Sequence, residues 1–350
     1  MENPVVCIGL DIGGANLKCS AVEAEAGGKF RLLYSTVRDF TLNASGVVGE
    51  VAAEVGGADA VGVTCTAEYS RRYFRTIADG ISHYVRALAA IEDVPVLWVA
   101  LDGGMVPNER NPEPYRVAAA NWVASAIFAG RHLAAECIFV DVGSTTADII
   151  PVASGKPALS GRMDWERLGS GALVYTGAVN TPVGSIVRRL TVGGAPACVS
   201  TEVFSISGDI HLMLGHLSEL EFRAYTRNTA NPAECATRLA HMLCADDNLL
   251  DGDTLTDMAR QVYAGQVEEI AAGIRQIYDG SKEHFGGAKP PVVAAGLGAD
   301  FLGAKAARKA GFEDVRFVHE KYGKSFSVSM PAVSAALMAA DACGGGVDGR

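Results

Sequence analysis

The chain has 350 residues, of which 49% are hydrophobic and 20% are charged, and its formal net charge is −10. This length predicts about two domains, and the composition is that of a well-packed globular protein, not of a disordered or collagen-like one. The acidic balance disfavours nucleic acid as a partner, because phosphate backbones are held by clustered lysines and arginines, which are scattered here.

The sequence also predicts where the protein resides. Its eight cysteines include no C-x-x-C pair and lie mostly in apolar runs, which is typical of reduced, buried thiols in the cytoplasm. The N-terminus lacks the basic segment and cleavage site of a signal peptide. The longest apolar helical stretch, Val117 to Ala129, is shorter than the roughly 20 residues of a membrane span. We expect a cytoplasmic protein with no membrane partner, and its oligomeric state stays open.

The first part of the chain alternates strands with helices, which predicts a parallel or mixed sheet. It opens with an expected hairpin, in which an apolar strand from Val5 leads through the turn Asp11 to Asn16 into a second strand ending at Val22. The elements expected next are a strand at 32–37, a helix at 44–55, a strand at 60–63, a helix at 71–90, a strand at 95–99, a loop at 102–114 and an apolar helix at 117–129. We expect an N-terminal lobe over residues 1–135.

The pattern of the N-terminus returns at Cys137 to Val152, where a strand, a D-x-G turn and a second strand follow one another. An ancient duplication explains this repeat, which aligns Asp11 with Asp141, Gly13 with Gly143, Gly14 with Ser144, Asn16 with Thr146 and Lys18 with Asp148. The second copy is expected to open a second lobe over residues 136–343.

The second lobe is expected to carry helical insertions. Residues 160–210 are rich in Gly, Thr and Pro, and helices are expected at 219–243 and 253–278, the second with Asp253 and Thr254 as caps. A strand at 291–295 and a helix at 332–342 follow, and residues 344–350 are expected to form a flexible tail. The acidic run 246–253 lacks the ligand spacing of a calcium loop and predicts a turn that caps the next helix.

Both D-x-G turns are suited to hold an anion, because small residues let successive backbone N–H groups approach phosphate oxygens. The candidate phosphate-binding residues are Gly13, Gly14, Ala15, Asn16, Gly143, Ser144, Thr145 and Thr146. Asp11 and Asp141 end the strands before the turns, where carboxylates are placed to hold a hydrated Mg²⁺ against phosphates. Lys18 can neutralise further charge. A single D-x-G turn is more often a simple bend, but two matched copies favour a phosphorylated small molecule as the ligand.

The paired hairpins and the later segment Ala294 to Gly298 resemble the phosphate-one, phosphate-two and adenosine motifs of the acetate and sugar kinase, Hsp70 and actin superfamily. The resemblance implies an α/β fold of two lobes, each a duplicated, ribonuclease H-like domain, with a central cleft. It also implies that Gly296 and Gly298 contact a bound substrate. Segments 9–18 and 140–151 are most similar to the hydantoinase and oxoprolinase branch, whose members proper are much longer.

Among short members, the chain resembles the synthases of methylofuran biosynthesis, which are linked to tetrahydromethanopterin-dependent C1 metabolism. The segments that carry this resemblance are 64–68, 120–124, 173–177, 181–183 and 235–246. It implies a transferase that joins an aminomethylfuran-methyl diphosphate to the phenol of a glutamylated tyramine, or a tyrosine-like acceptor, with release of pyrophosphate. Mg²⁺ and the two loops would stabilise the leaving group, with Asp11, Lys18 and Asp141 as catalytic residues.

Three carboxylates are candidates for the base that deprotonates the phenol. Asp209 is the candidate we assign to catalysis, and Glu68 and Asp164 are assigned to substrate binding. Each of these residue types is more often a helix cap, a turn former or an ion-pair partner.

Two further polar residues are candidates for substrate binding. Arg167 can clamp a phosphate or a carboxylate through its planar guanidinium, and the alternative is an ion pair with Glu166 or Asp164. Asn121 is expected to contact substrate, whereas the neighbouring Trp122 is expected to lie in the core.

Three classes of function remain open. Besides the synthase, these are an ATP-dependent small-molecule kinase or a hydantoinase/oxoprolinase-like amidohydrolase, and a non-catalytic nucleotide-binding protein of the Hsp70 and actin sort. Gly296 to Gly298 is compatible with ATP but is a weak signal. Fold alone does not choose among these classes. We find no separate sugar-recognition domain, which disfavours a kinase, and no long interaction segment, which disfavours the non-catalytic protein. The synthase is therefore preferred.

Overall fold

The chain forms two compact units in the computed structural model, which describes residues 4–25, 27–69, 73–226 and 228–344. Unit 1 comprises Met1–Ala135, Val152–Asp164 and Val318–Arg350, and unit 2 comprises Glu136–Pro151 and Trp165–Phe317. Unit 2 begins at Glu136, the residue at which the sequence predicts the second lobe to begin. Segments 152–164 and 318–344 belong to unit 1, whereas the sequence predicts that the second lobe extends over residues 136–343.

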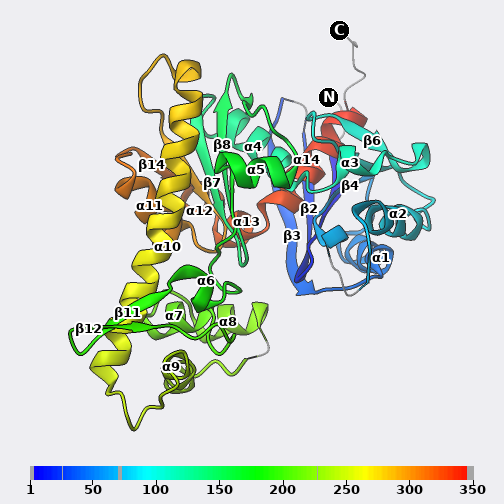
Figure 1. Ribbon diagram of the computed structural model, residues 1–350. Helices are drawn as coiled ribbons and strands as arrows, with labels where there is room; N and C mark the ends of the chain where they lie inside the picture. The colour runs from blue at the N-terminus through cyan, green and yellow to red at the C-terminus, as the bar shows by residue number, and fades with distance from the viewer. Residues whose placement is uncertain (1–3, 26, 70–72, 227, 345–350) are drawn as a thin grey trace. The chain divides into compact units, whose positions relative to one another are not determined.

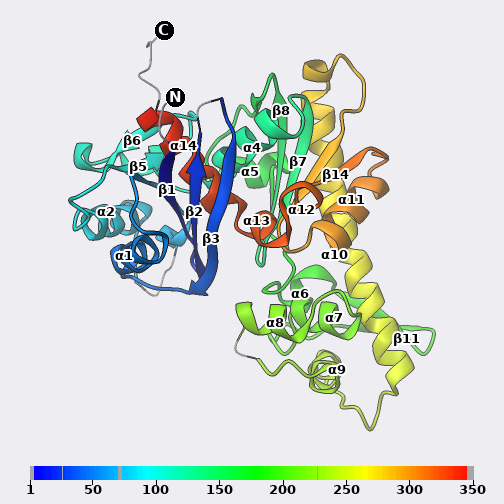
Figure 2. The same ribbon diagram turned by 180° about the vertical axis from the view of Figure 1, so that it is seen from behind.

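Unit 1 is built on a six-stranded sheet in the order β3-β2-β1-β4-β5-β6 (Figures 1 and 2). Its strands are β1 (Val5–Ile12), β2 (Asn16–Ala24), β3 (Phe30–Asp39), β4 (Ala60–Cys65), β5 (Val96–Val99) and β6 (Met105–Pro107). β1 and β2 form the expected antiparallel hairpin, and β1, β4 and β5 are parallel neighbours. The carboxyl ends of these three strands therefore meet at one edge of the sheet.

Helices pack on both faces of this sheet (Figure 2). α1 (Ala44–Val55) and α2 (Ile77–Leu88) cover the face to which Ile8, Leu10 and Ile12 contribute. α14 (Met330–Gly344) lies on the other face, directly against the backbones of β1 and β4. A Cβ atom on Gly9 would lie 1.8 Å from the Ala332 oxygen, and one on Gly62 would lie 2.0 Å from the Ala335 oxygen. Only glycine fits at these two positions.

Three helical segments of unit 1 depart from the sequence prediction. α2 begins at residue 77, behind a capping box formed by Thr76 and Asp79, and residues 70–72 of the expected helix lie outside the described residues. The expected loop at 102–114 contains β6 and a short 3₁₀ turn, Asn108–Arg110. The expected helix at 117–129 is divided into α3 (Pro114–Val117) and α4 (Asn121–His132). The break lies at Ala119, whose φ is 50° and whose N–H bonds to Cys65 instead of continuing a helix.

Unit 2 repeats the strand order of unit 1. Its sheet runs β10-β8-β7-β13-β14, with β9 beside β8. The strands are β7 (Cys137–Val142), β8 (Ala147–Ala153), β9 (Lys156–Pro157), β10 (Leu173–Val174), β13 (Val292–Ala295) and β14 (Val315–Phe317). β13 is parallel to both β7 and β14, as β4 is parallel to both β1 and β5. This repeat confirms the duplicated α/β fold.

A region with its own small core is inserted between β10 and β13. It contains α6 (Val183–Ile186), the hairpin β11 (Arg189–Val192) and β12 (Ala195–Cys198), α7 (Ser207–Met213), α8 (Glu219–Tyr225), α9 (Pro232–His241) and α10 (Gly252–Ser281). Val183, Ile210, Leu239 and Met258 pack in its core. α10 continues beyond this core to α11 (Ala304–Lys309), as Figure 1 shows. Residues 219–243 form two helices instead of one, because Asn231 and Pro232 start a new helix.

The acidic run before α10 caps this helix, as predicted, but through a different residue. Asp251 accepts a hydrogen bond of 2.8 Å from the Thr254 amide, so the cap lies two residues before the predicted Asp253. The remaining helices of the chain are α5 (Asp164–Ser170), α12 (Val318–Tyr322) and α13 (Lys324–Val328).

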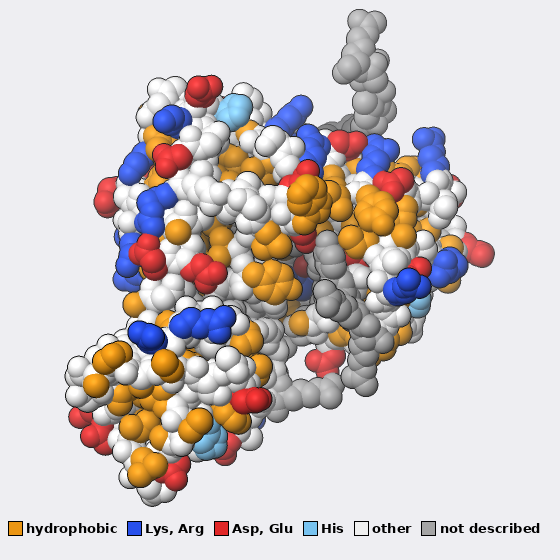
Figure 3. Space-filling model, in the orientation of Figure 1, with side chains coloured by type: hydrophobic (Ala, Val, Ile, Leu, Met, Phe, Trp, Pro, Cys, Tyr) orange, Lys and Arg blue, Asp and Glu red, His pale blue; other side chains and the backbone are white. Residues whose placement is uncertain are grey.

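Surface and thiol chemistry complete the description of the fold. Within the described ranges, no helix is long and apolar enough to cross a membrane. Acidic and basic side chains are interspersed on the face shown in Figure 3. All eight cysteines are free thiols, and five of them are buried. Cys244 is exposed, against expectation, because α9 ends at residue 241 and Cys244 follows it.

Candidate functional site

The first predicted phosphate turn lies between β1 and β2. The Gly13 amide donates to the Asn16 carbonyl at 3.0 Å and closes the turn, and Asn16 is buried at the start of β2. A Cβ atom on Gly13 would lie 2.7 Å from that carbonyl oxygen, so this position needs glycine. Gly14 and Ala15 are exposed at the tip. The turn is narrow and accessible, as an anion-binding main chain must be.

Asp11 stands at the end of β1 and is only 4% exposed. Lys18 lies opposite it on β2, with Nζ 3.2 Å from Asp11 Oδ2. The Thr64 hydroxyl of β4 lies 3.2 Å from Asp11 Oδ1. The carboxylate is thus held between a cation and a hydroxyl, and the structure brings together the two catalytic candidates of the first hairpin.

Glu68 lies just beyond the end of β4, in the 3₁₀ turn Ala67–Tyr69, and is 2% exposed. Among the described residues, neither of its carboxyl oxygens reaches a partner at hydrogen-bonding geometry. Burial raises the pKa of Glu68 to about 8, and the charge of Asp164 adds to this rise, against the lowering effect of backbone amides and of the Cys65 thiol. A carboxyl group with this pKa exchanges protons near neutral pH, which is typical of functional sites.

The end of β4 connects Glu68 with the first hairpin. The Thr66 amide donates to the Ile12 carbonyl at 2.9 Å, and Glu68 follows Thr66 by two residues. The backbone of Ala119 approaches the Glu68 carboxyl group, so Asn121, which begins α4 two residues later, is near it. Trp122 is buried in the core, as expected. The structure therefore brings the start of α4 toward Glu68, and Asp164 acts on Glu68 through its charge.

The second predicted turn, between β7 and β8, has the geometry of the first. The Gly143 amide donates to the Thr146 carbonyl at 2.9 Å, and Ser144 and Thr145 are half-buried at its tip. Residues 178–180 brace this turn, because their amides donate to the carbonyls of Gly143 and Ser144 at 2.8 to 2.9 Å. A Cβ atom on Gly177 would lie 2.5 Å from the Thr145 backbone. This brace is not predicted by the sequence, and the resemblance carried by segment 173–177 is the signal that points toward it.

The glycines after β13 lie directly against the second turn. Asp141 ends β7, and a Cβ atom on Gly296 would lie 2.3 Å from Asp141 Oδ1. The Gly296 φ of 86° also favours glycine. The Gly298 amide donates to the Val142 carbonyl at 2.9 Å. The structure therefore brings Asp141, Gly296 and Gly298 together in unit 2.

Arg167 pairs with a residue that was not considered in the sequence. Its guanidinium is 1% exposed and pairs with Asp148 on β8. Asp148 occupies the position in the second hairpin that Lys18 occupies in the first. A buried guanidinium paired in this way supports the second hairpin from within unit 2, and we do not retain Arg167 as a ligand clamp.

Asp209 lies outside both hairpin sites, in the inserted region. Its carboxylate accepts hydrogen bonds from the Ile206 amide and the Ser205 hydroxyl, at 3.0 and 3.1 Å, and from Arg238 at 2.7 and 3.1 Å. These contacts cap α7 and form a buried ion pair, which is the alternative weighed from the sequence. We therefore transfer the role of base from Asp209 to Glu68.

The carboxylates at the strand ends are the candidate metal ligands. In the part of the chain that the structure describes, no three His, Cys, Asp or Glu residues are grouped as metal ligands. Mg²⁺ needs only one or two carboxylates when phosphate and water supply its other ligands. Asp11 and Asp141 stay the candidate carboxylates, one in each unit.

The fold and the two glycine turns define an α/β protein of duplicated, ribonuclease H-like units. A model of the hydantoinase/oxoprolinase family matches residues 59–342, and the chain belongs to this family. Among solved structures, nucleotide-free acetone carboxylase matches with a TM-score of 0.52 and 13% identity, over 94% of this chain and 70% of that chain. This match agrees with the expected fold class.

Two curated relatives are synthases of a furan-2-yl methanamine whose phenoxymethyl group carries a γ-L-glutamylaminoethyl chain. The Methanocaldococcus jannaschii protein is 29% identical over 346 residues, which cover 95% of this chain and 97% of that protein. The Methanococcus vannielii protein is 30% identical over 217 residues, which cover 61% of this chain and 95% of that protein. These matches confirm the resemblance to the methylofuran-biosynthesis synthases and support an enzyme of the transferase type.

Proposed function

We propose that this chain condenses an aminomethylfuran-methyl diphosphate with the phenol of a glutamylated tyramine. The phenol oxygen forms a bond to the methylene carbon of the furan, and the bond from that carbon to the diphosphate oxygen breaks. The electron pair leaves with pyrophosphate, and the phenol proton passes to a base. Support comes from the relatives, whose named product joins these two parts by a phenoxymethyl link.

The first hairpin is proposed to stabilise the leaving diphosphate. Its exposed tip offers backbone N–H groups, and Lys18 supplies a positive charge beside Asp11. Donors and cations at the departing oxygens act where negative charge develops, which is how such sites accelerate a reaction. We propose that the second hairpin also binds phosphate, through its amides and the hydroxyl of Thr145.

A divalent ion fits these hairpins. Asp11 and Asp141 are the residues that would hold Mg²⁺, and the ion would neutralise charge on the diphosphate when bound. Lys18 remains 20% exposed beside Asp11, so the same carboxylate can orient the ammonium group toward phosphate.

Glu68 is proposed as the base. The observation that carries the proposal is its buried position next to the end of β4. It is buried beside the strand end that contacts the first hairpin, without a partner among the described residues, and its pKa is raised to about 8. The pKa of a phenol is usually about 10. A carboxyl group with a raised pKa lies close to this value, so its carboxylate accepts a phenol proton readily. Burial is the main cause of this raised pKa, and the charge of Asp164 adds to it.

The test follows two products separately. The purified protein is incubated with Mg²⁺ and either ATP or the furan diphosphate together with γ-glutamyltyramine, and ADP and pyrophosphate are measured. We expect pyrophosphate only when both organic substrates are present, together with the ether product by mass spectrometry. Glu68→Gln is expected to abolish most of this release, and Glu54→Gln, on the exposed side of α1, is the matched control. ADP formation without pyrophosphate would contradict the proposal and favour the kinase class.

A further inference from the structure

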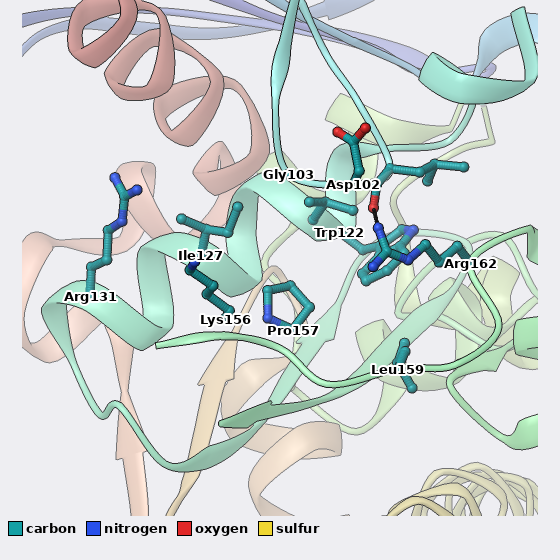
Figure 4. Close-up of a pocket in the computed structure, with 11 residues that line it drawn as sticks. Asp102, Gly103, Trp122, Ile127, Arg131, Lys156, Pro157, Leu159 and Arg162 are labelled. Atoms are coloured by element: carbon teal, nitrogen blue, oxygen red, sulfur yellow. Dashed lines mark hydrogen bonds between the residues drawn. The ribbon is translucent and has the colours of Figure 1, made fainter. Parts of the chain in front are cut away.

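A cavity of about 260 Å³ opens in unit 1 between α4, the loop after β5 and segment 156–162 (Figure 4). Apolar side chains from α4 and from residues 157–159 form much of its lining, including those of Trp122, Ile127 and Leu159. Ligand pockets are usually somewhat larger, about 300 to 1,000 Å³. This cavity therefore suits a group the size of one amino acid.

Charged residues of both signs line the same cavity. Arg162 donates to the Leu101 carbonyl at 2.6 Å, and this contact sets its guanidinium beside Asp102. Figure 4 shows Asp102 and Arg162 at one end, with Lys156 and Arg131 toward the other. Arg131 pairs with Asp341 at 2.6 Å. An arginine carries five N–H donors, so Arg162 can hold Leu101 and a ligand carboxylate together.

Asp102 is held as an anion. The Gly104 amide lowers the pKa of its carboxyl group, and a hydrogen bond from Arg116 lowers it further. The amide lies 2.9 Å from one carboxylate oxygen, and the Arg116 guanidinium lies 2.9 Å from the other. One anion, Asp102, and three cations, Arg131, Lys156 and Arg162, thus line one small cavity. This arrangement matches the ammonium and carboxylate groups of an amino acid.

The strand order places this cavity in line with the proposed reaction site. β1 ends at the first hairpin, β4 ends beside Glu68, and β5 ends two residues before Leu101 at the cavity. Neighbouring strands lie about 4.8 Å apart, so the ends of β1 and β5 are separated by about 10 Å. Arg162 also precedes Asp164, which acts on the Glu68 pKa, by two residues. The first hairpin, Glu68 and the cavity therefore follow one another along the same edge of the sheet.

We propose that this cavity binds the γ-glutamyl group of the acceptor and so determines acceptor specificity. Arg162 holds its α-carboxylate beside Asp102, which holds its α-ammonium, while Lys156 adds positive charge from the other end of the cavity, and the linker leads the phenol to Glu68. This assignment rests on the proposed function, because the acceptor is defined there. It explains why the cavity carries opposite charges on an apolar wall.

Three phenols test the assignment by calorimetric binding to the intact protein. γ-Glutamyltyramine carries both charged groups, N-glutaryltyramine keeps the carboxylate without the ammonium, and tyramine lacks the glutamyl group. We expect affinity to fall in that order, by roughly 10- to 100-fold for each charged group that the ligand lacks. Equal binding of the three phenols by the wild-type protein would overturn the assignment.

Variants separate the two contacts. Arg162→Gln is expected to weaken binding of both carboxylate-bearing phenols, whereas Asp102→Asn is expected to weaken only γ-glutamyltyramine. Lys156→Gln gives a second carboxylate variant that does not disturb the Leu101 contact, and Arg86→Gln on the exposed side of α2 is the matched control. Thermal unfolding checks that each variant is folded. Full preference for γ-glutamyltyramine in folded Arg162→Gln and Lys156→Gln would overturn the assignment.

The readout distinguishes this inference from the proposed function. Ether formation at equal KM with tyramine and γ-glutamyltyramine would overturn the cavity assignment while the transferase activity stands. Selective, Arg162-dependent binding of γ-glutamyltyramine without any pyrophosphate release would support the cavity and contradict the proposed reaction.

Discussion

In unit 1 the carboxylate at the strand end faces Lys18, whereas the matching strand position in unit 2 holds Asp148, whose partner is the buried Arg167. The strand next to the first hairpin leads to Glu68, and the strand next to the second leads to Gly296. The duplicated turns have kept their backbone and have acquired different charges. We infer that unit 1 supplies a base and a cation to the chemistry, while unit 2 supplies a braced loop.

The largest effect is expected for Glu68→Gln. Loss of the base should lower kcat by roughly 10²- to 10⁴-fold. In the wild-type protein the rate should rise with pH, with the midpoint of the rise at about pH 8, because only the ionised carboxylate accepts the phenol proton. Steady-state pyrophosphate release across pH 6 to 10 measures both. A wild-type profile that is flat over this range would remove Glu68 from the reaction.

Lys18→Met should have the next largest effect. Removing the cation beside the leaving group should lower kcat by roughly 10²- to 10³-fold. The change also takes the ammonium away from the buried Asp11 carboxylate, so thermal unfolding is measured to check that the variant is folded. Lys29→Met, at an exposed position between β2 and β3, is the matched control. If Lys18→Met turns over as fast as Lys29→Met, then Lys18 does not stabilise the leaving group.

Asp11→Asn and Asp141→Asn compare the hairpins directly. Each variant should stay folded and lose most activity, about 10-fold or more, because each removes an anionic ligand from the metal and phosphate site. Titrating Mg²⁺ while following pyrophosphate should show that the metal concentration for half-maximal rate rises in both. Near-normal turnover in both variants would end the assignment of metal ligands.

Arg167→Met should act on stability. A charge left alone after its buried partner is removed typically costs about 3 to 5 kcal/mol of unfolding free energy. Denaturant unfolding measures this loss, and a second change, Asp148→Leu, should restore much of it. A loss below about 1 kcal/mol in the single variant would show that this pair does not hold the second hairpin.

The smallest expected effect is a change in how stability depends on pH. The ordinary pKa of Glu68 is 4.5 and its folded value is about 8, so the folded protein keeps a proton that the unfolded chain releases between these values. The free energy of unfolding should therefore fall as pH rises through this window. Glu68→Gln should flatten that fall, whereas Glu54→Gln should not. Parallel slopes for all three proteins would mean that Glu68 titrates normally.

Local patterns make much of this structure predictable. Strand alternation, two D-x-G turns and paired glycines are encoded within a few residues, so the hairpins, their duplication and the carboxylates at the strand ends follow from sequence. The break at Ala119 does not, because a left-handed alanine is set by its hydrogen bond to a distant strand. Neither does the cavity at Asp102 and Arg162, whose lining comes from three separate segments. The ion pair that holds Asp209 does not follow from sequence either, because its partner Arg238 lies 29 residues further along the chain.

The packing of α14 on Gly9 and Gly62 has a consequence for biosynthesis of the chain. The strands of the sheet that positions Asp11 precede unit 2 in the chain, yet the second face of this sheet is covered by α14, which follows unit 2. Domains commonly fold in order during translation. Here unit 1 cannot complete its packing until α14 is made, so one face of its sheet stays uncovered while unit 2 is translated.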